Sequence, residues 1–184
     1  MAKNKNKKVT TETLQDLYQT CPRATFFRRL GAYTYDLFAI AAVLMVAGIF
    51  AILMVMLGAK IGLISLEGYQ DVAAYLSEST VFAAYLGLVI IGFYGYFWTK
   101  AGQTLGMKAW RLRVQNSDGS NISLTQAVIR MATSAFGLGN IMALFTDRNA
   151  FQDLWGECEV VVLTKEMSNW KGFKGMGFMD LDKK

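Results

Sequence analysis

The chain has 184 residues, of which 53% are hydrophobic and only 18% are charged. This length suits one domain rather than two, and the charged fraction is too low for a typical water-soluble domain. The formal net charge is +5, but the basic residues gather beside apolar runs, so we expect a bilayer with anionic head groups as a partner and no nucleic acid.

Residues 1–22 are predicted to form a basic, flexible arm in the cytoplasm. Four lysines lie among the first eight residues, and no apolar run follows them promptly. There is no A-x-A cleavage site either. We therefore expect the first membrane helix to remain in the mature protein.

Residues 37–59 contain no charged side chain and predict the first transmembrane helix. As a helix these 23 residues rise about 34 Å, enough to cross a hydrocarbon core of about 30 Å. The helix is expected to begin earlier, near Phe26, because Pro22 is well placed to open the preceding turn and nothing between them breaks the pattern.

Residues 79–99 form a second uncharged run, which ends in an aromatic cluster typical of a membrane interface. The preceding segment, 60–78, is predicted to be a short acidic loop. Seven Lys and Arg residues precede the first span, one lies in the acidic loop, and five lie in segment 100–130. The positive-inside rule then predicts a cytoplasmic N-terminus and a cytoplasmic second loop.

The second loop is predicted to contain a small β-ribbon. Residues 111–115 resemble a strand, the pair Asp118-Gly119 is a turn signal, and residues 159–163 resemble a second strand whose natural partner is the strand around Val114. Pairing requires both strands to lie on the same side of the membrane.

The third apolar run, 131–146, leaves two alternatives open. A helix capped by Ser123 could cross the membrane if Arg130 reached back to the cytoplasmic head groups. Alternatively, Gly137, Gly139 and Asn140 could break the run into two short helices that enter and return. The expected strand pairing favours the second alternative, because the chain must come back to the cytoplasmic side.

These elements predict an all-α membrane protein. It would have two full transmembrane helices, a third spanning or re-entrant broken helix, and a small cytoplasmic β-ribbon. The predicted divisions are the arm at 1–22, a membrane domain at 23–163 and an exposed tail of low order at 164–184.

The residue types also limit the chemistry. The chain has no histidine and two cysteines, Cys21 and Cys158, which lie far apart in the sequence and are interpreted as reduced packing residues. This excludes most metal-site patterns and the usual histidine-based catalysis. No nucleophile elbow or cofactor fingerprint appears, so we predict a protein that is not an enzyme and needs no cofactor.

Arg29 and Asp36 are the candidate functional pair. Seven residues make nearly two helical turns, so both side chains lie on one face, about 10 Å apart along the axis. A carboxylate at membrane depth usually faces protein or a water cavity. Asp36 could therefore move an ion or simply join two helices by a hydrogen bond or ion pair.

Several blocks of the sequence occur in an order that resembles the RDD family of bacterial membrane proteins. They are Arg29 with Asp36, residues 102–108, residues 111–114, Asp118-Gly119, Arg130, residues 152–156 and Val160-Val161. The resemblance implies a multi-pass protein of the bacterial inner membrane and identifies Arg29, Asp36 and Asp153 as the arginine and two aspartates of the family name. Two positions depart from the family pattern, with Gln152 in place of a common histidine and Cys158 in place of a common threonine.

The resemblance also implies transport of an unidentified ligand, with cation-proton exchange proposed for some members. A small transporter built from two or three spans would have to form a homo-oligomer. The alternative is an accessory or assembly subunit that docks on a larger membrane complex. An ion pair between Arg29 and Asp153 would leave Asp36 free for another partner, for which we consider Arg130.

Overall fold

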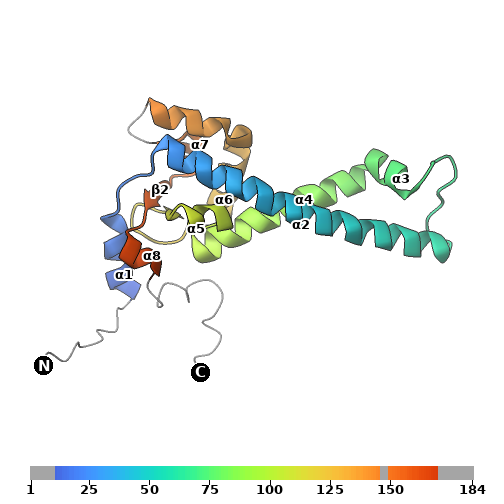
Figure 1. Cartoon of the computed structure of the whole chain (residues 1–184), viewed down its shortest axis with the longest axis horizontal. Coiled ribbons are helices and arrows are strands. Elements are labelled where there is room, and N and C mark those ends of the chain that lie inside the picture. Colours follow the sequence, from blue (N-terminus) through green and yellow to red (C-terminus); the bar gives the residue numbers. More distant parts are fainter. Residues whose placement is uncertain (1–10, 146–148, 170–184) are drawn as a thin grey trace, which may run out of the picture.

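A computed structural model describes residues 11–145 and 149–169 of the chain. Two long helices form a hairpin that projects from a compact base, and the short helices and both strands of the described residues gather at that base, except for one helix at the far tip (Figure 1). We call the two parts the hairpin and the base.

The first arm of the hairpin is α2, Phe26–Lys60. Its apolar stretch contains no helix breaker, and the helix ends where Gly62 adopts a left-handed conformation with φ of 77°. The second arm is α4, Thr80–Tyr96, which continues as a π-helical turn, η1, Phe97–Ala101. Both arms are long and apolar enough to span a membrane, as the sequence predicted.

The tip of the hairpin contains a short helix, α3, Val72–Glu78, where the sequence predicted only a loop. The Asp71 side chain caps this helix by accepting a hydrogen bond from the Ala74 backbone N–H at 2.7 Å. A seven-residue helix has too little apolar periodicity to stand out in a sequence, which is why a loop was expected here.

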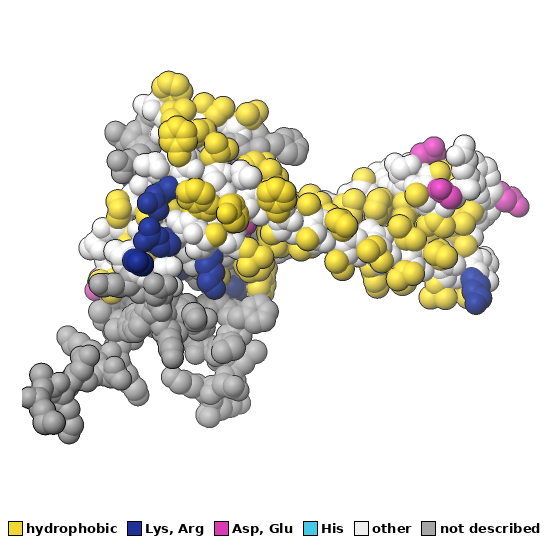
Figure 2. All heavy atoms as spheres, in the orientation of Figure 1, with side chains coloured by type: hydrophobic (Ala, Val, Ile, Leu, Met, Phe, Trp, Pro, Cys, Tyr) yellow, Lys and Arg dark blue, Asp and Glu magenta, His cyan; other side chains and the backbone are white. Residues whose placement is uncertain are grey.

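The surface of the hairpin is largely apolar on the face shown in Figure 2, where the charged side chains at the tip are mostly acidic and those at the base are mostly basic. In the most apolar stretches of the two arms, only 17% and 6% of the residues are buried. Large side chains such as Phe38, Met45, Phe50 and Leu88 are more than half exposed. Such a surface is stable in contact with lipid or with another membrane helix rather than with water.

The base is organised around a two-stranded antiparallel sheet. Strand β1, Leu112–Gln115, pairs with β2, Glu159–Val162, in a register that places Val114 opposite Val160. The predicted β-ribbon is therefore present. Between η1 and β1 lies a short helix, α5, Leu105–Ala109, which packs against the first turns of α2.

The third apolar run is broken rather than continuous. Helix α6, Leu124–Thr133, begins with a capping box made by Ser123 and Gln126, and it meets the 3-10 helix η2, Ala135–Leu144, at a bend of 87°. Helix α7, Phe151–Trp155, follows, and then β2 returns to pair with β1. Because β1 and β2 pair at the same end of the hairpin, the run begins and ends at the base, which is the geometry expected of the re-entrant alternative.

Two expectations about the ends of the domain were wrong for the residues that the structure describes. Residues 11–22 are not a free arm, because α1, Thr11–Gln19, packs on the base with Tyr18 only 1% exposed. The start of the predicted tail is also ordered, since α8, Lys165–Asn169, brings Met167 against Cys21. Residues 1–10 and 170–184, which hold the rest of both predicted segments, lie outside the described residues.

Candidate functional site

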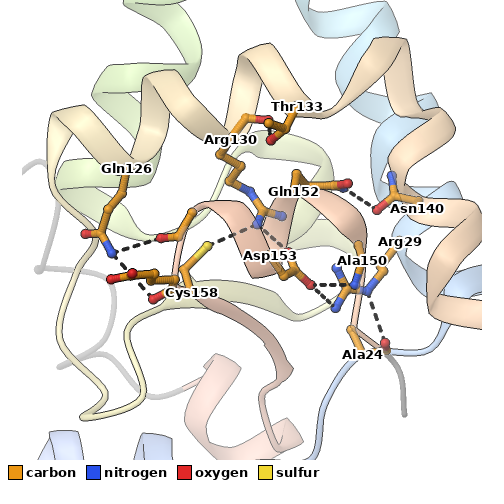
Figure 3. Close-up of polar contacts among 12 residues, drawn as sticks. Ala24, Arg29, Gln126, Arg130, Thr133, Asn140, Ala150, Gln152, Asp153 and Cys158 are labelled. Atoms are coloured by element: carbon orange, nitrogen blue, oxygen red, sulfur yellow. Dashed lines mark hydrogen bonds and ion pairs between the residues drawn. The ribbon is translucent and has the colours of Figure 1, made fainter. Parts of the chain in front are cut away.

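Three charged side chains from three different helices meet in the base. Arg29 comes from the first turns of α2, Arg130 from the last turn of α6, and Asp153 from α7 (Figure 3). One carboxylate oxygen of Asp153 lies 2.6 Å from Arg29 Nη2, and the other accepts a hydrogen bond from Arg130 Nη1. We call this arrangement the Arg-Asp-Arg triad.

The triad is buried and joined to its surroundings by further hydrogen bonds. Arg29, Arg130 and Asp153 are 4%, 5% and 2% exposed. Arg29 Nε donates to the Ala24 carbonyl at 3.1 Å, and the Ala150 N–H donates to Asp153 at 3.2 Å. These contacts connect the start of α2 to the loop before α7. The sequence-based hypothesis of an Arg29 to Asp153 pair is therefore confirmed in the structure.

The electrostatics of the triad are dominated by the two guanidiniums. Burial by itself would raise the pKa of the Asp153 carboxyl, but Arg130 and Arg29 hold that pKa below its usual range. Cys158 lies 3.3 Å from Arg130 Nη1, and burial raises the pKa of its thiol despite that neighbour. The carboxylate therefore stays ionised and the thiol stays protonated at neutral pH.

Asp36 has partners other than those considered from the sequence. Its carboxylate oxygens accept hydrogen bonds from the Thr104 hydroxyl at 2.5 Å and from the Gly106 N–H at 2.8 Å. The proposed contact with Arg130 was wrong, because Arg130 pairs with Asp153. Asp36 instead joins α2 to the first turn of α5, which is the helix-joining alternative left open by the sequence.

A cavity of about 490 Å³ lies between α2, α4, α6 and η2. Arg29, Asp36, Trp98 and Arg130 line it, and most of the remaining wall consists of aliphatic and aromatic side chains. This volume is within the range of roughly 300–1,000 Å³ typical of small-molecule sites. Three of the four candidate residues, Arg29, Asp36 and Arg130, thus line one largely apolar cavity, and Asp153 contacts two of them without lining it.

A hydrogen bond between η2 and α7 contributes to the wall of the cavity. Gln152 is 3% exposed, and its side-chain amide donates to Asn140 Oδ1 at 2.7 Å. Figure 3 shows this pair beside the triad. Gln152 therefore fixes the position of the broken helix at the place where the family pattern often has a histidine.

Comparison with known proteins is consistent with this geometry. The model of the RDD family matches residues 23–157, which is well over half of the chain. The chain belongs to the RDD family. Comparisons with curated proteins and with solved structures give no match. Among the described residues of this RDD protein, no three His, Cys, Asp or Glu side chains are grouped to hold a metal ion.

All four residues predicted for the site lie inside the range that matches the RDD model. Sequence reasoning missed Thr104 and Gly106, although both belong to the block 102–108 that contributed to the resemblance. A Cβ atom at Gly106 would lie 2.1 Å from the Ala32 carbonyl oxygen, so Gly106 is a point of close helix packing.

Proposed function

We propose that this RDD protein is a small, non-enzymatic transporter that binds its solute in the cavity between the hairpin and the broken helix. The cavity carries the proposal, because it lies within the membrane domain and has charged residues in an otherwise apolar wall. Ionisable side chains at membrane depth are costly, and they commonly mark solute or ion pathways. A purely structural core would be expected to fill this space with side chains.

We propose that protonation and deprotonation of Asp36 change the shape of the cavity. Its two hydrogen bonds hold α5 against α2, next to the cavity wall. An ionised carboxylate is a stronger acceptor than a protonated one. Proton uptake would weaken the contact with the Gly106 N–H and loosen α5 from α2, which would change the cavity.

A transporter of this size would work as a homo-oligomer or within a larger membrane complex. The described residues of each chain contribute two helices that can cross a membrane, too few to enclose a pathway, and the apolar surfaces of both helices are mostly exposed. We propose that copies of the hairpin pack against one another in a bacterial inner membrane. The basic end of the chain supports a cytoplasmic base, by the positive-inside rule.

Flux measurements in sealed vesicles test the proposal. The purified full-length protein is reconstituted with a pH-sensitive dye inside, and sodium, potassium and proton gradients are applied in turn. We expect wild-type protein to move protons or cations and Asp36→Asn to abolish that flux while the protein still elutes as a folded oligomer. Glu67→Gln is the matched control, because Glu67 is an exposed carboxylate in the tip loop.

Two results would contradict this proposal, the first for the role of Asp36 and the second for transport itself. One is unchanged flux in Asp36→Asn, which would remove the coupling role of Asp36. The other is an absence of flux in the wild type under every gradient, together with a partner membrane protein that co-purifies in fixed ratio. That second result would support the accessory-subunit alternative.

A further inference from the structure

The cavity has a polar end and an apolar end. Arg29, Trp98 and Arg130 line it near the base, whereas Ile40 and Ile90 line it farther along the hairpin. On α2, Ile40 comes eleven positions after Arg29, which corresponds to about 16 Å along the helix axis. The polarity of the wall therefore changes along the direction in which a lipid chain would lie.

The polar end carries an excess of positive charge. The triad has two guanidiniums and one carboxylate, and Asp153 does not itself line the cavity. The second carboxylate of the region, Asp36, also lines the cavity, and its two oxygens already accept hydrogen bonds from Thr104 and Gly106. A ligand group beside Trp98 therefore meets the positive charge of Arg130, whose guanidinium carbon lies 5.2 Å from that ring.

Two buried N–H donors at this end have no acceptor among the described residues. They are Arg130 Nε and Trp98 Nε1, on side chains that are 5% and 8% exposed. Leaving such a donor buried and unpaired costs about 1–3 kcal/mol, more when the group is charged. An anionic oxygen in the cavity would supply the missing acceptor.

We propose that the cavity binds a single-chain amphiphile with an anionic head group. The head lies beside Arg130 and Trp98, and the hydrocarbon chain extends past Ile90 and Ile40. This inference rests on the proposed function and names its substrate class. A metal cation is a poorer match, because the Asp36 oxygens are both engaged and the described residues offer no cluster of ligands.

Photolabelling in nanodiscs of phosphatidylcholine tests the assignment. The probe is a sixteen-carbon carboxylic acid with a diazirine at mid-chain, compared with the matched alcohol and the matched trimethylammonium compound. We expect the acid to label peptides containing Ile90 or Ile40 about tenfold more than either analogue, the effect of one charge-assisted hydrogen bond. Unlabelled hexadecanoic acid and hexadecyl phosphate, used as competitors, distinguish a carboxylate from a phosphate head group.

Two pairs of variants locate the site. Trp98→Phe keeps an aromatic ring beside Arg130 but removes the N–H donor, and it should lower labelling by the acid several-fold. Trp155→Phe is its control, because Trp155 is an exposed tryptophan of α7, and it should leave labelling unchanged. Ile90→Trp fills the apolar end and should prevent labelling of the cavity. Leu88→Trp is its control, because Leu88 is on the same helix but is 67% exposed and does not line the cavity.

Equal labelling by the acid, the alcohol and the ammonium compound would overturn the assignment, as would unchanged labelling in Ile90→Trp. Either result would mean that the probe reports only lipid on the surface. The outcomes are separable from those of the flux assay. Flux without acid-selective labelling would refute this ligand class alone, and acid-selective labelling without flux would refute transport alone.

Discussion

At the residue scale, Asp153 is the common partner of two buried arginines. It is 2% exposed, and its two oxygens contact guanidiniums from α2 and α6. Removing one member of a buried ion pair costs more than the pair contributes as a whole, because the remaining charge stays buried without compensation. Asp153 has two such charges to compensate.

We therefore expect Asp153→Asn to lower the stability of the protein by about 3–5 kcal/mol, the range for breaking a buried pair. The measurement is thermal unfolding of the detergent-purified protein, followed by tryptophan fluorescence and by size-exclusion profile. Asp118→Asn is the control, because Asp118 is an exposed turn residue. If the two variants unfolded at the same temperature, the triad would not be a major source of stability.

The same residue predicts how stability depends on pH. The folded-state pKa of Asp153 lies below its usual value, so its contribution is fully present above the unfolded pKa of about 3.9 and is lost as the pH falls through the folded pKa. We expect the unfolding temperature to hold between pH 7 and 5 and to fall below about pH 4. In Asp153→Asn this part of the acid dependence should be missing, and an unchanged acid profile would assign it to other carboxylates.

At the scale of elements, the contact between α5 and α2 depends on glycine. An added Cβ at Gly106 would lie 2.1 Å from the Ala32 carbonyl, and one at Gly31 would lie 2.3 Å from the Trp110 ring. Backbone cannot move aside as a flexible side chain can. The close approach at Gly106 is also what lets its N–H reach the Asp36 carboxylate.

Gly106→Ala should therefore push α5 away from α2 and destabilise the base by about 1–3 kcal/mol, as overpacking does. Gly92→Ala is the matched control, since a Cβ at Gly92 meets nothing within 4 Å, and alanine favours a helix over glycine. The difference in stability is measured as the difference between the midpoints of thermal unfolding of the two variants. A Gly106→Ala protein as stable as Gly92→Ala would show that the packing there is loose.

The elements differ in how far the sequence predicted them. The two hairpin arms were predicted because a long charge-free run has few alternatives to a membrane helix. Helix α1 was missed, because its polar composition hides the buried side chain of Tyr18, which stacks on Arg113 with the guanidinium 4.0 Å from the ring centroid. That contact is with a distant segment and leaves no local pattern.

At the scale of the whole molecule, the return of the chain after η2 determines which groups can meet. Strand β2 pairs with β1, and Asp153 reaches Arg29 at the first turns of α2. Both contacts require α6 and η2 to begin and end at the base (Figure 1). A third full crossing would place Asp153 at the opposite end of the hairpin.

Cysteine labelling tests this topology. In a background with Cys21→Ser and Cys158→Ser, single cysteines are introduced as Glu67→Cys at the tip, Ser117→Cys in the β1 turn and Lys165→Cys after β2, all at exposed positions. With a membrane-impermeant thiol reagent on intact cells, we expect only Glu67→Cys to react. Labelling of Lys165→Cys together with Glu67→Cys would instead mean that the third run crosses the membrane.

The sequence by itself predicted a chain suited to lipid, with two spans and two short strands, because these depend on hydrophobic length and residue type, which are local properties of the chain. It also identified Arg29, Asp36, Arg130 and Asp153 as candidates. Only the tertiary structure decided that Asp153 pairs with both arginines, that Asp36 turns to Thr104 and Gly106, and that a cavity lies between them. Those partners are set by how helices distant in sequence pack, and hydrophobic periodicity contains no record of that packing.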